Sequence, residues 1–290
     1  MTVNIHPNTV IAESAVFAKE VSIAPFCVIG ENVVIGEGTV LSPGCTLAEG
    51  VRVGKGVRLG SHVTLGENAE LAAGITIGDN TVIYPQTIIG EGTFIGSSSS
   101  VGRSPRAASA STVKNQTDLP PLTIGSNCTI GCGAVVYAGT VLADGVFVGD
   151  RTSVRERCSL ASKVVVGSGS TVENDTRIGA YTKIQSCSYI TAYMEIEERV
   201  FIAPMVTTTN DNFMGRTEKR FKYIKGATIR KGARIGGGAI LLPGIEVAEE
   251  TFVAAGSIVT KNTVPRKVFK GFPAREVKDV PVEELTENNL

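Results

Sequence analysis

The chain contains no tryptophan, has only two histidines, and carries no excess of charge of either sign. Of its 290 residues, 28 are Lys or Arg and 28 are Asp or Glu, so the formal net charge is zero. Balanced charge argues against a nucleic-acid binder or a polybasic membrane protein. No apolar run approaches the roughly 20 residues that a membrane span requires, and the first residues lack a signal-peptide pattern. We therefore expect a cytoplasmic protein that binds no nucleic acid and has no membrane span.

Few residues of this chain are suited to bind a metal. His6 and His62 are far apart in the sequence, and the six cysteines form no CxxC pair. Cys128 and Cys132 lie close together, but no histidine or second cysteine pair accompanies them to complete a zinc site. We expect small buried thiols and no metal centre.

Glycine is abundant, with 33 residues, and aliphatic residues recur at every sixth position. Steps of six lead from Ile11 to Val101, from Ile124 to Thr208 and from Ile229 to Val259, and 36 of these 37 positions carry Ile, Leu, Val or Phe. Neither the 3.6-residue period of a helix nor the two-residue period of a single strand explains this spacing. A coil of short strands explains it, with one strand and one tight corner in each hexad and three hexads in an 18-residue turn.

The six-residue repeat resembles the left-handed parallel β-helix of the hexapeptide acyltransferases, over nearly the whole chain. The left hand is taken from this resemblance, and 37 hexads predict about twelve turns. We expect an all-β coil over residues 1–264, with inserted loops at about 103–122 and 210–225. Residues 265–290 are expected to form a short C-terminal cap with a helix.

Both insertions interrupt the same face of the predicted coil if the 18-residue register survives them. Between them, one corner carries polar residues in place of glycine. Stacking at intervals of 18 residues predicts two neighbouring columns: Glu156, Asn174 and Asn210, and Arg157, Asp175 and Asp211. A solvated polar edge would explain such a corner, but the two flanking loops favour a binding cleft.

A closer resemblance covers about Val200 to Val277. The segments FIAPMVTTTNDNFMGR, KGATIRKGARIGGGAILLPGIEV, VAAGSIVTKN and VFKGFPARE are similar to the C-terminal half of bacterial N-acyltransferases that modify nucleotide-linked amino sugars. This resemblance implies transfer of an acetyl or short acyl group from acyl-CoA to a dTDP- or UDP-linked amino sugar, for surface polysaccharide or glycolipid synthesis. It also implies a homotrimer with sites between subunits.

The N-terminal part resembles the acyltransferases of the lipid A pathway. In those enzymes a catalytic histidine lies in a segment similar to VRERC, Val154 to Cys158, where this chain has Glu156. The substitution leaves open whether Glu156 replaces the base or whether the two segments correspond at all.

Acyl transfer to an amine requires a positioned amine, donors for the oxyanion and an acceptor for the proton. The leading candidate proton acceptors are Glu156 and Asp211, because carboxylates in an acidic column can have raised pKa values. Glu218, on the second inserted loop, is a third candidate. If the amine enters neutral and no base is needed, Glu156 and Asp211 only orient the sugar. The candidate substrate-binding residues are Tyr137, Arg155, Arg157, Asn174, Asp175, Tyr193 and Asn210, although single tyrosines are often packing residues.

The C-terminal coils hold the candidates for coenzyme A binding. Gly236, Gly237 and Gly238 would let the pantetheine arm approach the backbone, and a tight corner is the alternative explanation. The remaining candidates are Ala255 and the basic residues Lys261, Arg266, Lys270 and Arg275, which would meet the phosphates or simply form a solvated basic end.

Two other functions remain open. An O-acyltransferase normally needs a histidine to deprotonate a hydroxyl, and neither His6 nor His62 suits that role. A non-catalytic β-helical scaffold belongs to a different class and would gain no thermal stability from acetyl-CoA.

Overall fold

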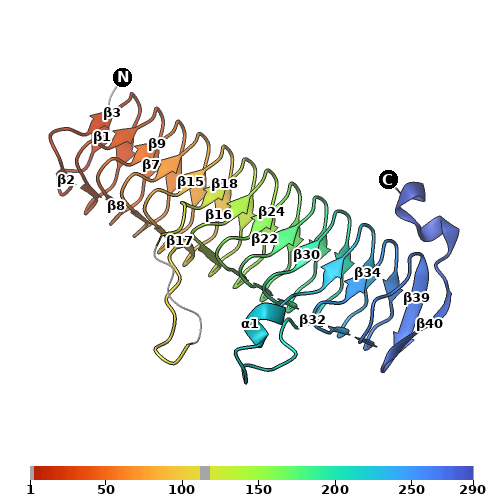
Figure 1. Ribbon diagram of the computed structural model, residues 1–290. Coiled ribbons are helices and arrows are strands. Elements are labelled where there is room, and N and C mark those ends of the chain that lie inside the picture. Colours follow the sequence, from red (N-terminus) through yellow and green to blue (C-terminus); the bar gives the residue numbers. More distant parts are fainter. Residues whose placement is uncertain (1–2, 112–117, 290) are drawn as a thin grey trace. The chain divides into compact units, whose positions relative to one another are not determined.

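The computed structural model describes residues 3–111 and 118–289, which form two compact units, Met1–Arg151 and Thr152–Leu290. Both units are coils of short parallel strands, with three strands in each turn (Figure 1). The all-β coil predicted from the six-residue period is therefore confirmed, and its left hand stays a prediction. The boundary between the units lies inside the predicted coil 1–264, and the division proposed at residue 264 also stays a prediction.

Three parallel sheets make up the first unit. The first contains β1 (Asn4–Ile5), β4 (Ser22–Ile23), β7 (Val40–Leu41), β10 (Arg58–Leu59), β13 (Thr76–Ile77), β16 (Phe94–Ile95), β19 (Thr129–Ile130) and β22 (Phe147–Val148). The second contains β2 (Val10–Ile11), β5 (Val28–Ile29), β8 (Thr46–Leu47), β11 (Thr64–Leu65), β14 (Val82–Ile83), β17 (Ser100–Arg103) and β20 (Val135–Tyr137). The third contains β3 (Val16–Phe17), β6 (Val34–Ile35), β9 (Arg52–Val53), β12 (Glu70–Leu71), β15 (Ile88–Ile89), β18 (Thr123–Ile124) and β21 (Val141–Leu142).

The second unit repeats this arrangement. Its first sheet contains β25 (Val165–Val166), β28 (Lys183–Ile184), β31 (Phe201–Ile202), β34 (Arg234–Ile235), β37 (Phe252–Val253), β39 (Lys267–Gly271) and β40 (Ala274–Asp279). Its second contains β23 (Ser153–Val154), β26 (Thr171–Val172), β29 (Tyr189–Ile190), β32 (Thr207–Thr208), β35 (Ile240–Leu241) and β38 (Ile258–Val259). Its third contains β24 (Ser159–Leu160), β27 (Arg177–Ile178), β30 (Glu195–Ile196), β33 (Thr228–Ile229) and β36 (Glu246–Val247).

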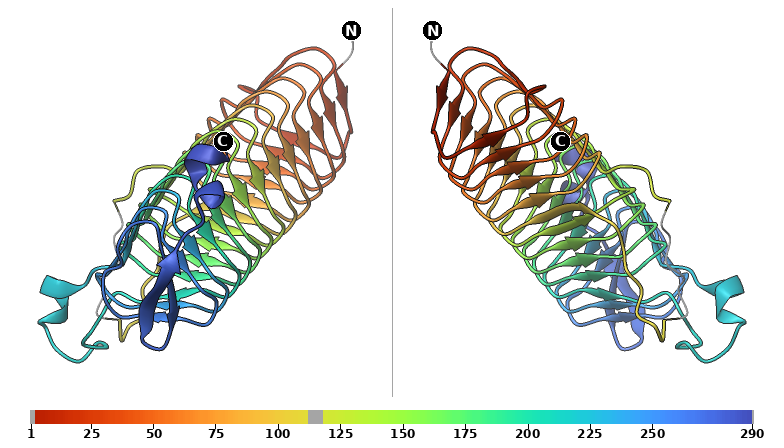
Figure 2. Two further views of the ribbon diagram at one scale, coloured as in Figure 1. Left: turned by 90° about the vertical axis from the view of Figure 1, so that its right-hand side faces the viewer. Right: turned by 90° about the vertical axis from the view of Figure 1, so that its left-hand side faces the viewer.

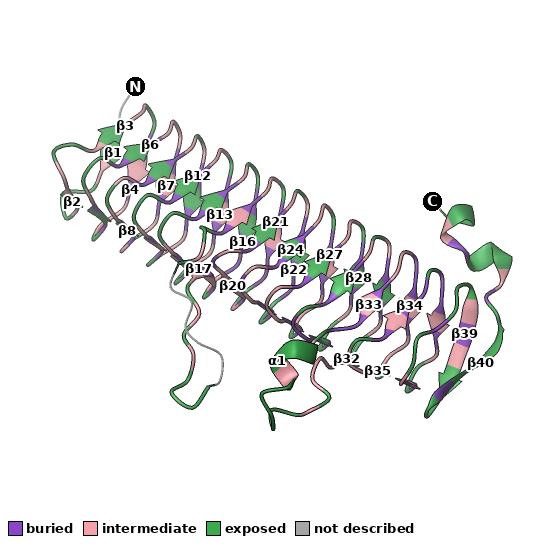
Figure 3. Cartoon of the chain, viewed as in Figure 1, coloured by how far each residue is buried: buried purple, intermediate pink, exposed green. Residues whose placement is uncertain are grey.

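The core follows from the alternation of side chains along each short strand. In most strands the second residue is the aliphatic one that the period identifies and is buried, while the first faces outward (Figure 3). Because successive side chains of a strand point to opposite faces, one aliphatic residue per strand fills the interior. Leu65 illustrates the stacking, since it pairs with Leu47 on one side and Ile83 on the other.

The 18-residue register survives each insertion within its own unit. Ile89 pairs with Ile124 across the first inserted segment, and Thr208 pairs with Leu241 across the second. Residues 112–117 of the first inserted segment lie outside the described residues. The second segment follows β32 and contains the short helix α1 (Arg220–Tyr223), which projects from its unit in Figure 1.

The C-terminal cap differs in detail from the expected helix. Strands β39 and β40 form an antiparallel hairpin, and β39 continues the first sheet of the second unit by pairing in parallel with β37 (Figure 2). Two short 3-10 helices follow, η1 (Val282–Glu284) and η2 (Thr286–Asn288). Leu285 packs with Val268, Val280 and Phe252, which holds this segment on the last coils. No helix in the described residues is long and apolar enough to cross a membrane.

Candidate functional site

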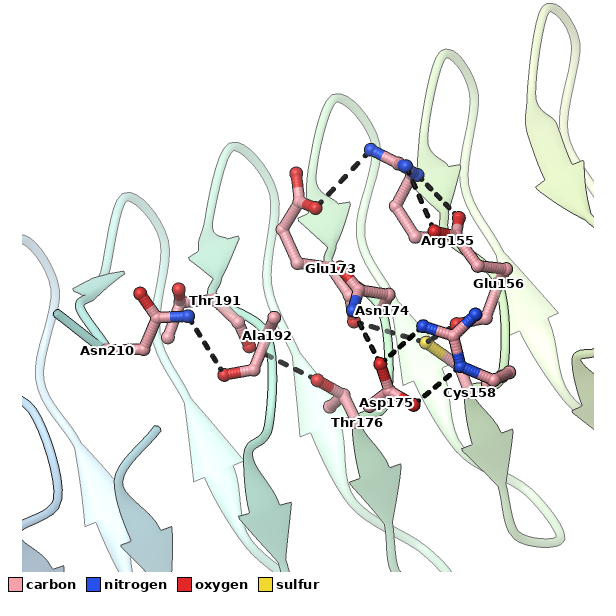
Figure 4. A network of polar contacts seen from close by, with 11 residues as sticks. Arg155, Glu156, Cys158, Glu173, Asn174, Asp175, Thr176, Thr191, Ala192 and Asn210 are labelled. Carbon is pink, nitrogen blue, oxygen red and sulfur yellow. Dashed lines mark hydrogen bonds and ion pairs between the residues drawn. The ribbon is translucent and has the colours of Figure 1, made fainter. Parts of the chain in front are cut away.

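The polar corner predicted from the sequence forms on the second unit, after strands β23, β26, β29 and β32. Val154, Val172 and Ile190 pair in register, so the residues that follow them stack on neighbouring turns (Figure 4). The Asp175 amide donates to the Glu156 carbonyl oxygen at 3.2 Å. Two turns further along, the Asn210 side chain donates to the Ala192 carbonyl oxygen at 3.4 Å. The structure therefore brings together most of the residues of the two predicted columns.

Glu156 is buried in this corner, with 5% of its surface exposed. Both of its carboxylate oxygens accept hydrogen bonds from Arg155, from Nε at 2.9 Å and from NH2 at 3.1 Å. A guanidinium binds a carboxylate in this forked geometry strongly and directionally. The contact fixes the orientation of Arg155, so the geometry suits a positioning role for Glu156 better than the role of a proton acceptor.

Both carboxylate oxygens of Asp175 also accept hydrogen bonds from neighbouring side chains. Arg157 donates to it from Nε at 2.7 Å and from NH2 at 2.6 Å, and the Asn174 side chain donates at 2.5 Å. Burial would raise the pKa of Asp175, but the hydrogen bonds from Arg157 and Asn174 outweigh burial and lower it. The same pairing raises the pKa of Arg157. This pair is a fixed part of the corner, ionised at neutral pH.

Glu173 is a third carboxylate of the corner, absent from the candidates chosen from the sequence. Its Oε2 lies 3.5 Å from NH1 of Arg155, and 22% of its side chain is exposed. Burial and the neighbouring Glu173 carboxylate, through its charge and a side-chain hydrogen bond, raise the pKa of the Tyr189 phenol. The 18-residue spacing from Arg155 could have identified Glu173, because the register places residues 155 and 173 on adjacent turns.

The contacts of Asp211 contradict its predicted raised pKa. Its carboxylate accepts hydrogen bonds from the Phe213 amide at 2.8 Å, the Gly215 amide at 2.9 Å and the Arg220 guanidinium at 3.3 Å. The amide of Phe213 is the main cause of a lowered pKa at Asp211, where the sequence predicted a raised one. Asp211 therefore organises the second inserted loop, and its engaged carboxylate is unsuited to accept a proton from a substrate.

We expect Asp211→Asn to loosen this loop without unfolding the coil. The amides of Phe213 and Gly215 should exchange with deuterium faster than in the wild type, because they lose a charged acceptor. Since the pKa of Asp211 is lowered, the wild-type protection should persist at neutral pH and fall as acid protonates the carboxylate. Glu218→Gln is the control, because Glu218 is exposed on the same loop. Equal exchange in the Asp211 variant and the wild type would contradict this role.

The remaining substrate candidates divide between the two units. Tyr193 is exposed at the corner with a φ of +64°, and its amide donates to the Asn174 carbonyl oxygen at 3.2 Å. Tyr137 belongs to the first unit, where the guanidinium carbon of Arg103 lies 5.3 Å from the centre of its ring. Tyr193 is therefore part of the described corner, whereas Tyr137 is held by a contact within its own unit.

In the segment Gly236–Gly238, the backbone geometry explains why glycine is present at two of the three positions. A Cβ on Gly236 would lie 2.4 Å from the backbone nitrogen of Ala255, so only glycine lets these two turns stack. Gly238 has a φ of +65°, which favours glycine. A Cβ on Gly237 would meet the Pro204 carbonyl oxygen at 3.4 Å, which is ordinary contact.

A matched pair of substitutions tests this explanation. Gly236→Ala should lower the free energy of unfolding by about 1–3 kcal/mol, because its Cβ overlaps a backbone atom that cannot move without distorting the coil. Gly237→Ala should change it by about 0.5 kcal/mol or less. Urea denaturation measures both, and equal effects would show that the spacing of the turns is not what requires glycine.

The four basic residues predicted to meet the phosphates of coenzyme A have different surroundings. Arg266 pairs with Glu287 at 3.3 Å and lines a pocket of about 140 Å³ together with Arg199, Lys231, Glu249, Glu250, Thr286 and Glu287. Lys270 and Arg275 lie opposite each other in the β39–β40 hairpin, and Lys261 is exposed after β38. In residues 3–111 and 118–289 no group of three or more His, Cys, Asp or Glu could hold a metal ion.

Comparison with family models identifies the repeat. The bacterial transferase hexapeptide model matches residues 2–43 and 32–67, and the model of the hexapeptide repeat of succinyl-transferase matches residues 56–84, 86–103, 121–150 and 226–261. The chain belongs to the hexapeptide-repeat transferase family. Together these matches cover more than half of this hexapeptide-repeat protein.

Individual relatives match parts of the hexapeptide-repeat chain. A serine acetyltransferase of Buchnera aphidicola is 34% identical over 120 residues, which are 41% of this chain and 33% of the relative. The bifunctional protein GlmU of Rubrobacter xylanophilus is 31% identical over 116 residues, 40% of this chain and 23% of the relative. The chain thus spans a third or less of these relatives. Among solved structures, a UDP-N-acetylglucosamine acyltransferase from Campylobacter jejuni aligns over 95% of this chain and 75% of its own, with 17% identity and a TM-score of 0.34.

Proposed function

We propose that this hexapeptide-repeat protein is an acyl-CoA-dependent N-acyltransferase. It transfers an acetyl or short acyl group to the amino group of a dTDP- or UDP-linked amino sugar, for surface polysaccharide or glycolipid synthesis. Family membership, the acetyl transfer named for the Buchnera relative and the similarity of residues 200–277 to amino-sugar N-acyltransferases support this proposal. Acyl-CoA serves as co-substrate without a metal, and a homotrimer with sites between subunits is the proposed assembly.

The composition of the polar corner carries the choice of an amine as acceptor. Three carboxylates, Glu156, Glu173 and Asp175, face two guanidiniums, Arg155 and Arg157, so the corner has an excess of one negative charge when all five are ionised. An acidic surface attracts an ammonium group, which then enters as the neutral amine after losing a proton. A hydroxyl acceptor requires a stronger base, and both histidines of the chain lie in the first unit.

A substrate panel tests the proposed function. The purified protein is incubated with acetyl-CoA or longer acyl-CoAs and with dTDP- and UDP-linked amino sugars, each beside the matching sugar that carries a hydroxyl in place of the amine. Release of free thiol and the product mass should show one acyl group added to the amino sugars. Acylation of the hydroxyl sugars instead would indicate an O-acyltransferase.

Thermal denaturation with coenzyme A separates an enzyme from a scaffold. A ligand present at 100 times its Kd stabilises the folded state by about 2.7 kcal/mol. We expect a clear upward shift of the melting temperature with acetyl-CoA. A protein that is not stabilised and releases no thiol with any acceptor would contradict the proposed function.

A further inference from the structure

The carboxylates near the polar corner differ in how fully their oxygens are engaged. Glu156 accepts two hydrogen bonds from Arg155, Asp175 accepts three from Arg157 and Asn174, and Asp211 accepts two backbone amides and Arg220. All of these contacts are 3.3 Å or shorter. A carboxylate held in this way gives up strong interactions if it takes a proton.

Glu173 is held more loosely than these three. Its ion pair with Arg155 is 3.5 Å long, and its side chain is 22% exposed. An ion pair of this length outside the buried interior costs little to rearrange. Glu173 therefore combines access from solvent with a negative charge that a substrate can reach.

We infer that Glu173 is the catalytic carboxylate that meets the acceptor amine and takes its proton, with Arg155 and Tyr189 as its positioning residues. This inference rests on the proposed function. Glu156 acts indirectly. Its buried forked contact fixes the orientation of Arg155, and Arg155 in turn faces Glu173.

Tyr189 completes the arrangement from the adjacent strand β29. Burial and the charge of Glu173 raise the pKa of the Tyr189 phenol, so it stays protonated at neutral pH and can serve as a donor to that carboxylate. Tyr189 is 42% exposed, which leaves its ring accessible to a sugar. Arg155 and the phenol of Tyr189 are therefore the two groups that can orient the Glu173 carboxylate.

In the proposed step, one proton passes from the amine to Glu173 and then to the leaving thiolate. The neutral amine nitrogen attacks the thioester carbonyl carbon, and a C–N bond forms while the carbonyl oxygen becomes an oxyanion. Glu173 takes one proton from the nitrogen as its charge becomes positive. The C–S bond then breaks, the carbonyl re-forms, and the thiolate of coenzyme A takes the proton from Glu173. The products are an amide and free coenzyme A thiol.

The test compares Glu173→Gln with Glu195→Gln in the same acyl-transfer assay. Glu195 lies on β30 in an exposed pair with Arg177, with 3.9 Å between the charged atoms, outside the polar corner. We expect Glu173→Gln to lower kcat by roughly 10²-fold or more with little change in the KM for acyl-CoA. Glu195→Gln should keep the wild-type kcat and KM.

Two further variants keep the result interpretable. Glu173→Asp keeps the carboxylate and should recover part of kcat, while Tyr189→Phe should lower kcat by less than Glu173→Gln does. Thermal melting of each variant establishes that it is folded. A wild type that acylates amines beside a fully active, folded Glu173→Gln overturns this inference alone. A wild type that acylates no amine overturns the proposed function and the inference with it.

Discussion

Replacing Leu142 with Ala is expected to lower the free energy of unfolding by about 2–5 kcal/mol. Leu142 is 1% exposed, and its neighbour Val141 on the same strand, β21, is 48% exposed. Truncation of Leu142 leaves a cavity in an interior that receives one aliphatic side chain per strand, and neighbouring turns cannot close it without breaking their register. Urea denaturation measures the loss.

Val141→Ala is the matched control for this prediction. Because Val141 faces outward, its truncation should change the free energy of unfolding by no more than about 1 kcal/mol. The two residues are adjacent, so local backbone effects are shared. If both variants lost the same stability, the assignment of inward and outward positions along the strands would be wrong.

The second large effect is expected for Asp175→Ala in the polar corner. Removing this carboxylate deprives Arg157 and Asn174 of their acceptor. A hydrogen bond to a charged group contributes about 1.5–3 kcal/mol to the free energy of unfolding. Arg157 and Asp175 are each less than one-third exposed, so solvent screens the pair only in part. A loss in this range is therefore expected at pH 7.

The effect of Asp175→Ala should depend on pH in a defined direction. The pKa of Asp175 is lowered in the folded state, so its stabilisation is complete above the ordinary aspartate pKa of about 3.9 and disappears as the pH falls through the lowered value. The wild type and the variant should thus converge in acid. Glu195→Ala, which breaks the exposed pair with Arg177, should cost less than about 1 kcal/mol at any pH. A constant difference between the Asp175 variant and the wild type down to strong acid would contradict the ion-pair explanation.

The coil and its register were predictable because the period repeats in nearly every turn. A spacing of 18 residues predicted that Val154, Val172 and Ile190 would pair, and the sheets confirm it. The same spacing resumes after each insertion, so Thr208 pairs with Leu241 as predicted. Repetition fixes the backbone of neighbouring turns, since each strand must hydrogen-bond to the strand one turn away.

Side-chain partners were less predictable than the backbone. Asp211 was expected in the column, but its partners Phe213, Gly215 and Arg220 lie in the inserted loop, where no period applies. Glu156 was favoured as a carboxylate of an acidic column, and the sequence could not show that the adjacent Arg155 engages both of its oxygens. Such contacts depend on rotamers, which a repeat does not determine.

The cap shows a similar limit. Residues 265–290 were expected to contain a helix, and they begin with a hairpin because Val268 extends the first sheet by pairing with Phe252. Gly271, with a φ of +99°, and the following Phe272-Pro273 provide the turn of this hairpin. A glycine and a proline between two short runs are a turn signal that would have favoured strands.

A crystal structure with coenzyme A and a nucleotide-linked amino sugar tests the central claim most directly. We predict that the amino nitrogen of the sugar lies within about 3 Å of the Glu173 carboxylate, a hydrogen-bond distance. The sulfur of coenzyme A should lie next to the same nitrogen. A sugar whose amine is bound away from the corner formed by Arg155, Glu156 and Glu173 would contradict the assignment of this corner as the site of acyl transfer.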